Sequence, residues 1–443
     1  MDTLRQVTQV LGGGPAGPDA GRSGVAPADG LGAPRSERGC GHPSVLRAIA
    51  AEAGIERVRM LAWRDLDDRE AGGSELHAHR IAGLWAAAGL RVETRTSAVP
   101  GAPTVVERDG YRAVRRSGRY GVFVRAGLDV ARDRRSGGAF GEGLVEIWNG
   151  MPFWSPLWYA GPRIVFLHHV HTEMWRMVLP RWLARVGETT ERRLAPPVYG
   201  STRIVTLSES SKQEIVDLLG LDPARVSVAP PGVDAQFSPG AAGSRSPVPL
   251  VVAVGRLVPV KRFDLLLRSL ARAKRDHPHL RAVIVGDGYE RPRLEGLTRE
   301  LGASGWVEFA GRLPDTEVIG WYRRAWLVAS ASLREGWGMT LTEAGACATP
   351  AVATDIAGHR DAVLHERTGL LASGEEDLAG ALSALLGDAS ARQRLGEAAR
   401  RHAAAFTWHS SARATLEALA EEACHLAHTR ARYPVRVPVP LIR

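Results

Sequence analysis

The chain has 443 residues, of which 44% are hydrophobic and 24% are charged, the proportions of a soluble globular protein with room for two domains. It contains no run of about 18 apolar residues, which excludes a membrane-spanning enzyme. Its three scattered cysteines show no CxxC spacing, which argues against a disulfide framework or a cysteine zinc site and makes the cytoplasm the expected compartment.

The net charge of +9 is spread along the chain as arginine-rich patches. Such patches can attract nucleic acid or an anionic membrane, but heavy use of Arg, Ala and Gly is also typical of a GC-rich genome. Binding of single-stranded nucleic acid needs aromatic side chains interleaved with the basic ones, whereas the tryptophans gather in apolar stretches such as EIWNGMPFWSPLWY. We therefore expect no nucleic-acid partner and keep peripheral contact with an anionic membrane as a hypothesis.

Residues 1–57 are rich in Gly, Pro and Ala and are predicted to form a disordered extension, closed by a short helix in PSVLRAIAAEAG. This stretch has no apolar block of the kind a secretory signal needs. Its GGGPAG segment is not a phosphate loop, because no strand precedes it and no GK[ST] follows.

From residue 58 short β-rich runs alternate with amphipathic helices, the pattern of parallel sheets covered on both faces. Residues 58–239 are predicted to form a first Rossmann-like domain, with strands in VRMLAW, RVETRTS, LVEIW, RIVFLHHV and RIVTLSES. The Pro- and Gly-rich residues 229–249 have the composition of an interdomain linker.

A second alternating series occupies residues 248–407. We expect the helix near residues 408–428 to pack back on the first domain and residues 429–443 to form a basic tail. Two doubly wound α/β domains in series place ligand crevices at the carboxyl ends of both sheets, facing each other across a cleft. A ligand with two parts would suit that arrangement.

The segment VVAVGRLVPVKRFDLLL places Arg256 and Lys261 just after a predicted buried strand. Two cations at the mouth of a strand–loop–helix unit can neutralise a diphosphate, Arg as a planar fork and Lys as a mobile point charge. The alternative is that both are solvated loop residues.

The segment SLREGWGMTLTEAGACATP carries Glu335 and Glu343 on either side of a helix start near Met339 or Thr340. Gly338 lets the backbone approach a ligand, and the free amides of a helix N-terminus bind anions. Carboxylates beside an anion site are best explained as acceptors for ligand hydroxyls. The alternative is a capped turn followed by an exposed helical glutamate.

Together these segments resemble the donor-binding signature of the retaining glycosyltransferases of family four, which have the GT-B fold of two facing Rossmann-like domains. GRLVPVKRFDLLL and REGWGMTLTEAGACATPAVATDIAG carry the resemblance. RDLDDREAGGSELHAHRIAGLWAAAGLRV is similar to the family's N-terminal glycine loop and helix, and APPGVDAQFSP to its interdomain crossing. The resemblance extends through most of residues 58–410.

The resemblance implies a role for each matching residue. Arg256 and Lys261 would bind the donor diphosphate and stabilise the leaving nucleotide. Glu343 would accept the ribose hydroxyls, and Glu335 would face the transferred sugar.

It also implies roles for the backbone around these side chains. The amides of Gly338, Met339 and Thr340 would meet sugar hydroxyls or phosphates. Gly72 and Gly73 would close over the diphosphate from the opposite domain.

Three histidines, His168, His169 and His171, follow the strand in RIVFLHHVHTEMW. The resemblance places a histidine near the reacting sugar, with His171 as the best positional match and His169 left open. A metal cluster is the alternative, but acidic or cysteine partners at a fitting spacing are not evident.

The implied reaction moves a hexose from GDP-mannose or a UDP-hexose to a hydroxyl of a glycan, glycolipid or small molecule, with retention and without a metal cofactor. In a same-face attack, a leaving-group phosphate oxygen takes the acceptor proton; Glu335 as a covalent nucleophile is the less favoured route. A metal site at the Asp-x-Asp of Asp65 and Asp67 is a rival hypothesis.

Two other functions stay open. One is a catalytically inactive GT-B-like binding module. The other is a dinucleotide-dependent oxidoreductase, although no G-x-G-x-x-G follows the first strand of either domain.

The tryptophan-rich segment and the HTEMWRMVLPRWLARVG that follows it are the predicted acceptor-facing surface. Arg176, Arg181 and Arg185 could touch an anionic headgroup. The alternative is that Trp175 and Trp182 pack inside.

Overall fold

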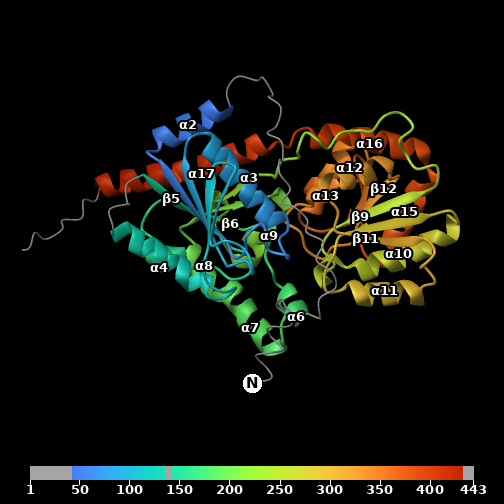
Figure 1. Cartoon of the computed structure of the whole chain (residues 1–443), viewed down its shortest axis with the longest axis horizontal. Coiled ribbons are helices and arrows are strands. Elements are labelled where there is room, and N and C mark those ends of the chain that lie inside the picture. Colours follow the sequence, from blue (N-terminus) through green and yellow to red (C-terminus); the bar gives the residue numbers. More distant parts are fainter. Residues whose placement is uncertain (1–41, 136–140, 433–443) are drawn as a thin grey trace, which may run out of the picture.

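The computed structural model describes residues 42–135 and 141–432, which form two α/β domains side by side along the long axis (Figure 1). Residues 1–41 of the predicted extension and residues 433–443 of the predicted tail lie outside the described residues. The short helix predicted to close the extension is present as α2 (His42–Glu52). The assignment of this helix to a disordered extension is corrected, because α2 packs on the last helix of the chain and its Leu46 and Ala50 are buried in the first core. The sequence boundary was set too late because the partner of α2 comes from the far end of the chain.

The first sheet has eight strands in the order β3-β4-β2-β1-β5-β6-β7-β8, and the β3–β4 pair is antiparallel. The strands are β1 (Arg57–Leu61), β2 (Arg91–Thr96), β3 (Val105–Arg108), β4 (Tyr111–Arg115), β5 (Glu142–Ile147), β6 (Arg163–Phe166), β7 (Arg203–Thr206) and β8 (Val226–Val228). The β3–β4 hairpin is absent from the sequence prediction. Its signal was the Asp109–Gly110 pair, which turns the chain with positive φ at both residues.

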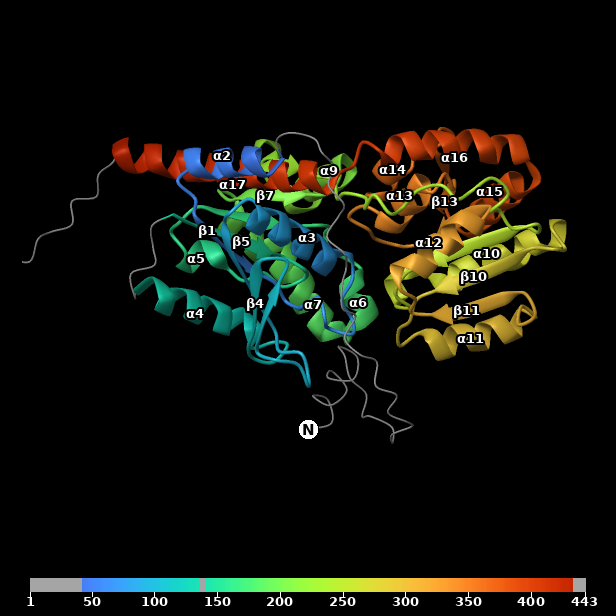
Figure 2. The same ribbon diagram turned by 45° about the horizontal axis from the view of Figure 1, so that its top comes forward.

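Helices cover this sheet on both faces (Figures 1 and 2). The helices of the first domain are α2, α3 (Gly73–Ala87), α4 (Val122–Arg135), α5 (Ser155–Trp158), α6 (Met174–Val178), α7 (Arg181–Thr189), the π-helical turn η1 (Thr190–Leu194), α8 (Ala195–Tyr199), α9 (Glu209–Leu219) and the 3₁₀ turn η2 (Pro223–Arg225).

The second sheet has six strands in the order β11-β10-β9-β12-β13-β14, with parallel pairings throughout. The strands are β9 (Leu250–Val254), β10 (Arg281–Val285), β11 (Val307–Gly311), β12 (Leu327–Ser330), β13 (Ala351–Thr354) and β14 (Gly369–Ala372). The helices are η3 (Pro259–Lys261, 3₁₀), α10 (Phe263–Asp276), α11 (Arg291–Glu300), α12 (Asp315–Arg324), α13 (Met339–Ala346), α14 (His359–Ala362), α15 (Glu375–Gly387), α16 (Ala389–Ala403) and α17 (Trp408–Arg432).

Strand β9 shows why this sheet is covered on both sides. Val251 and Ala253 belong to the hydrophobic core on one face, whereas Leu250 and Val252 belong to the core on the other. Successive side chains of a strand point to opposite faces, so an unbroken apolar run needs helices on both. The expected pair of doubly wound α/β domains is confirmed.

Helix α17 leaves the second domain and lies along the first (Figure 2). The indole Nε1 of Trp85 donates to the Ala412 carbonyl at 2.9 Å, and Leu416 is fully buried in the first core. Gly232 lies in the segment that runs from the first domain to the second. A Cβ atom added there would lie 2.1 Å from the backbone nitrogen of Trp408. The segment that enters the second domain and the segment that returns to the first domain are therefore in direct contact. Among the described residues no helix is long and apolar enough to cross a membrane.

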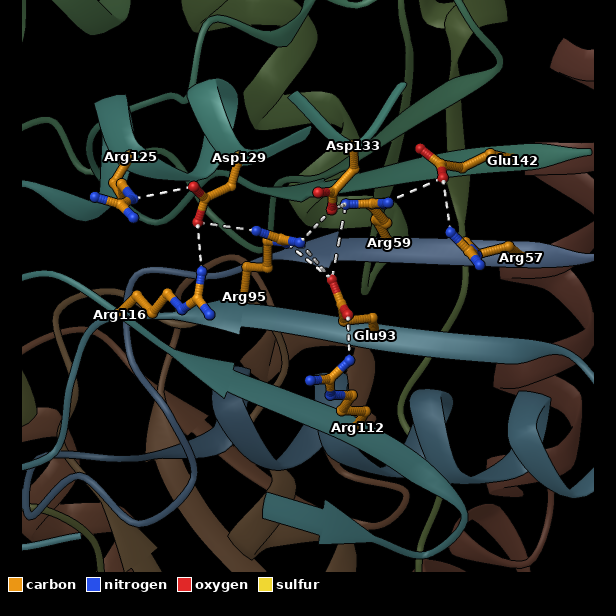
Figure 3. Close-up of polar contacts among 10 residues, drawn as sticks. All are labelled: Arg57, Arg59, Glu93, Arg95, Arg112, Arg116, Arg125, Asp129, Asp133 and Glu142. Atoms are coloured by element: carbon orange, nitrogen blue, oxygen red, sulfur yellow. Dashed lines mark hydrogen bonds and ion pairs between the residues drawn. The ribbon is translucent and has the colours of Figure 1, made fainter. Parts of the chain in front are cut away.

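Helix α4 docks on the first sheet through charged side chains (Figure 3). Asp133 of α4 accepts from Arg59 Nη1 at 2.6 Å and from Arg95 Nη2 at 2.7 Å, and Asp129, one turn earlier, lies 3.0 Å from Arg95 Nη1. Arg59 also reaches Glu142 at 3.1 Å. Because the arginines on β1 and β2 are buried, these carboxylates satisfy charges that would otherwise be costly to hold there.

Candidate active site

Lys261 and Glu335 form a partly buried ion pair at the carboxyl edge of the second sheet. Lys261 ends the turn η3 after β9, and Glu335 lies in the loop between β12 and α13. The carboxylate also accepts from Ser332 Oγ at 2.8 Å. Burial opposes ionisation of Glu335, but the Lys261 ammonium and the nearby His359 outweigh it and lower the pKa to about 2. Glu335 is therefore charged at neutral pH and suited to accept hydrogen bonds.

Arg256 joins the two domains at the same edge. Its Nη1 donates to the carbonyl of Glu70, in the first domain, at 2.8 Å. A Cβ on Gly72 would lie 3.0 Å from Arg256 Nε, so the glycine allows the guanidinium to approach the backbone. Burial and the neighbouring Arg64 lower the pKa of Arg256, but a guanidinium stays charged at any physiological pH.

The predicted glycine loop begins helix α3. Gly72 is its N-cap residue, and the backbone nitrogen of Gly72 donates to Oε2 of Glu75, the third residue of the helix, at 2.8 Å. A Cβ on Gly73 would lie 3.4 Å from Met339 Sδ, at the start of α13. The structure thus brings Gly72 and Gly73 against Arg256 and Met339, as a site shared by both domains requires.

Helix α13 begins as the sequence indicated. Gly338 is its N-cap residue with a φ of 112°, a conformation that favours glycine, and Met339 and Thr340 form its first turn. The amides of a helix's first turn have no intrahelical partners and can meet an anion or a hydroxyl.

Glu343 lies in a different environment from Glu335. It accepts from the hydroxyl of Tyr322 on α12 at 3.2 Å. Burial and the negative charge of Asp315 raise the pKa of Glu343 to about 7. The two predicted glutamates are therefore not an electrostatic pair: Lys261 holds Glu335 charged, whereas Glu343 titrates near neutrality.

The three histidines lie in the loop after β6, which ends at Phe166. His168 Nε2 lies 3.4 Å from His77 Nδ1, and His171 Nδ1 lies 3.4 Å from Glu191 Oε1. The Nε2 atom of His169 is buried without a hydrogen-bond partner among the described residues.

Of the three histidines, His169 is the one whose pKa is influenced by the charges of both Glu335 and Lys261. Burial and the adjacent His171 lower the pKa of His169 to about 3, with smaller effects from Glu335 and Lys261. The preference for His171 stays a prediction, and the structure gives His169 the surroundings expected of a residue near the reacting sugar.

The Asp-x-Asp segment is engaged in ion pairs. Asp65 accepts from Arg108 Nη1 at 3.0 Å and from Arg115 at 2.9 Å, and Asp67 pairs with the same two arginines. Within residues 42–135 and 141–432, no group of three or more His, Cys, Asp or Glu side chains is arranged to hold a metal ion. These contacts give Asp65 and Asp67 a structural role.

Several cross-domain contacts were not predicted. The hydroxyls of Ser208 and Ser211 donate to the carbonyl of Gly336 at 3.1 and 3.2 Å, and Arg334 reaches Glu173 at 3.0 Å. A Cβ on Gly336 would lie 2.4 Å from the carbonyl oxygen of His168. A tight approach at Gly336 could have been suspected from the glycines around Trp337, but its partners could not, because they lie more than a hundred residues away.

Comparisons with known proteins agree with this architecture. A family described as Glycosyltransferase Family 4 matches residues 71–237, and one described as Glycosyl transferases group 1 matches residues 235–402. The structure resembles sucrose-phosphate synthase from Thermosynechococcus elongatus, with a TM-score of 0.68 and 20% identity over 85% of this chain and 99% of that one. It also resembles Anabaena HepE in complex with UDP and glucose, with a TM-score of 0.63 and 18% identity over 85% of this chain and 100% of that one. The fold is thus that of the GT-B class.

Curated relatives carry the comparison further. The D-inositol 3-phosphate glycosyltransferase of Kribbella flavida is 36% identical over 240 residues, which cover 50% of this chain and 57% of the relative. That of Streptomyces bingchenggensis is 29% identical over 396 residues, covering 80% of this chain and 85% of the relative. The match thus spans little more than half of the first relative. Because the two family matches together run from residue 71 to residue 402, the chain belongs to the family-four type of GT-B glycosyltransferases.

Proposed function

We propose that this protein transfers a hexose from a nucleoside-diphosphate sugar to a hydroxyl acceptor with retention of configuration and without a metal ion. The observation that carries the proposal is the approach of Arg256 and Met339 to the Gly72–Gly73 loop at the boundary between two α/β domains, with the Lys261–Glu335 pair at the same sheet edge as Arg256.

The charges suggest how the site would act. Arg256 and Lys261 would neutralise the diphosphate as the sugar–phosphate bond breaks, which is where negative charge develops. Glu335, charged with a pKa of about 2, would accept a sugar hydroxyl and could not serve as a proton donor at neutral pH. In the same-face route a phosphate oxygen takes the acceptor proton, so the protein needs no base; positioning and charge neutralisation would supply most of the catalysis.

The donor and acceptor classes remain those implied by the sequence. A UDP-hexose is supported by the structural likeness to HepE, which was solved with UDP and glucose. GDP-mannose remains the other candidate. An inositol phosphate is a natural first small-molecule acceptor to test, because the relatives are D-inositol 3-phosphate glycosyltransferases; a glycan or glycolipid is the alternative.

A thermal-shift screen of UDP, GDP, UDP-glucose and GDP-mannose, in EDTA, tests the donor proposal. A ligand at 100 times its Kd stabilises the folded state by about 2.7 kcal/mol, which is readily seen as a higher Tm. Stabilisation by at least one nucleotide diphosphate in EDTA is expected. Absence of any shift would contradict the proposal, and a shift that requires manganese would contradict metal independence.

Adding NAD and NADP to the screen, and an activity assay for hydrolysis and transfer of the sugar, separates the other two functions. Nucleotide binding without hydrolysis or transfer of any sugar would support an inactive binding module. Stabilisation by NAD or NADP alone would support an oxidoreductase.

Peripheral membrane contact at the inner face of the membrane is proposed for helix α7. Trp182 is 58% exposed and Val186 is 55% exposed, one turn apart, beside the exposed Arg181 and Arg185. The arrangement joins apolar anchors to cations that anionic headgroups attract. Trp175, in contrast, is buried. Flotation with phosphatidylglycerol vesicles at low salt tests this: wild type should float and Trp182→Ser should not, whereas wild type remaining in the soluble fraction contradicts the contact.

A further inference from the structure

Glu191 is a fully buried carboxylate that accepts three hydrogen bonds. It lies in the π-helical turn η1 and is 0% exposed. Its oxygens accept from the backbone nitrogens of His171 at 2.9 Å and Thr172 at 3.1 Å, and from Trp175 Nε1 at 3.1 Å. His171 Nδ1 lies 3.4 Å away. One carboxylate thus ties the C-terminal half of the loop between β6 and α6 to the first turn of α6.

The helix is distorted where Glu191 enters the protein. A π-helical turn between α7 and α8 spans Thr190–Leu194, and such turns are rare and often lie at functional sites. Within it Glu191 is buried, whereas Arg192 and Arg193 are exposed. The π-helical turn therefore directs the Glu191 side chain into the protein and leaves its two basic neighbours exposed to solvent.

The buried carboxylate is charged. Burial alone would raise the pKa of Glu191, but the hydrogen bond and charge of His171, together with the amide and indole donors, lower it. A buried charge of this kind adds little to stability compared with an apolar side chain of the same size. Fixing the geometry of the loop is the better explanation of its presence.

The loop that Glu191 holds faces the donor side of the site. The rings of His171 and His169 stack with centroids 4.8 Å apart and planes at 29°, and the charges of Glu335 and Lys261 in turn act on His169. Glu173, in the same loop, reaches Arg334 of the second domain at 3.0 Å. Helix α6 contacts η3, the turn that ends in Lys261.

We propose that Glu191 is a positioning residue for sugar transfer. It fixes the loop of residues 168–175 so that the His171 ring supports His169, whose Nε2 has no hydrogen-bond partner among the described residues, near the Glu335–Lys261 pair. This inference rests on the proposed function, because the transferred sugar would lie between the loop and that pair. Glu191 itself touches no substrate.

Glu191→Gln tests the proposal. The amide keeps the size of the side chain but turns a donor toward other donors, so the loop should shift. We expect kcat for hydrolysis of UDP-glucose, or of GDP-mannose if the wild type prefers it, to fall about 100-fold, the effect of a displacement near 1 Å. The Kd for the matching nucleotide, UDP or GDP, should change less than about twofold because Arg256 and Lys261 are untouched.

Glu188→Gln is the matched control. Glu188 lies on α7 and pairs with the exposed Arg176 at 2.6 Å. Its substitution should leave kcat and the Kd for UDP or GDP within about twofold of wild type, as for surface changes in general.

A double-mutant cycle separates positioning from a general loss of structure. If Glu191 acts through His171, Glu191→Gln combined with His171→Asn should lose no more activity than the worse single variant. If the Gln variant does not fold, Glu191→Asp, which keeps the charge but shortens the reach, replaces it in the same cycle. Unchanged kcat, additive losses or a parallel loss of nucleotide affinity would overturn the proposal. A wild type that binds neither UDP nor GDP would instead overturn the proposed function.

Discussion

The two sides of the site are held in different ways. On the donor side, Lys261 and Glu335 are each set by a strand end and the helix that follows, within short segments of the second domain. On the opposite side, the loop of residues 168–175 is held by Glu191 of the same domain and by Arg334 of the other domain. Local chain geometry therefore defines the donor side, whereas the loop depends on contacts between distant segments.

The largest expected effect comes from Lys261→Ala, which breaks the donor side directly. It removes a cation from the diphosphate site and leaves Glu335 buried without its partner. We expect kcat/KM for the preferred nucleotide sugar to fall about 1,000-fold and the free energy of unfolding to fall by about 3 kcal/mol. Steady-state kinetics and urea denaturation measure the two losses. An active variant would mean that the phosphates bind elsewhere.

Glu335→Gln, also on the donor side, should lower turnover without a comparable loss of nucleotide affinity. Glutamine cannot offer a charged acceptor to the sugar, so kcat should fall about 100-fold. The Kd for UDP or GDP, which carry no sugar, should change little. Calorimetry beside kinetics checks the split, and equal losses in kcat and nucleotide affinity would contradict the assignment of Glu335 to the sugar.

Glu343→Gln should weaken nucleotide binding about tenfold, because a carboxyl acceptor for the ribose hydroxyls is lost. It should also change the pH dependence of stability. The folded-state pKa of Glu343 is about 7, above its ordinary value of 4.5, so between these values the folded state holds the extra proton and stability falls as pH rises. Removing the group should abolish up to about 3 kcal/mol of that fall. Urea denaturation at pH 5 and pH 8 measures it; a variant with the wild-type pH slope would contradict the raised pKa.

Gly72→Ala should have the smallest effect. The new Cβ would lie 3.0 Å from Arg256 Nε and push the guanidinium aside, at a cost of about 1 kcal/mol in nucleotide affinity. Gly380→Ala, in α15 with nothing within 4 Å of the added atom, is the control and should bind UDP or GDP like wild type. Equal behaviour of the two variants in calorimetry would show that Gly72 and Arg256 do not meet during binding.

Those parts of the structure that follow from local residue patterns could be predicted from the sequence. Two doubly wound domains followed from alternating apolar strands and amphipathic helices, and the structure brings Arg256, Lys261 and Glu335 to the carboxyl edge of the second sheet. The contacts of Glu191 and Arg334 could not be predicted from the sequence, because an isolated glutamate or arginine does not indicate a partner in another segment. The same limit hid the packing of α2 against α17.

The histidines show the limit most clearly. Spacing within RIVFLHHVHTEMW could not tell which imidazole faces the donor side, since the strand ends at Phe166 and the residues beyond it lose the alternation of a strand. Only the fold shows that His168 turns toward His77, His171 toward Glu191 and His169 toward Glu335 and Lys261.

Calorimetric titration of UDP and of GDP into wild type and Lys261→Ala, both in EDTA, tests the central claim most directly. The donor site described here predicts that wild type binds at least one of the two nucleotides without metal and that the variant binds it far more weakly. Binding of neither nucleotide by the wild type, or equal binding by both proteins, would contradict it.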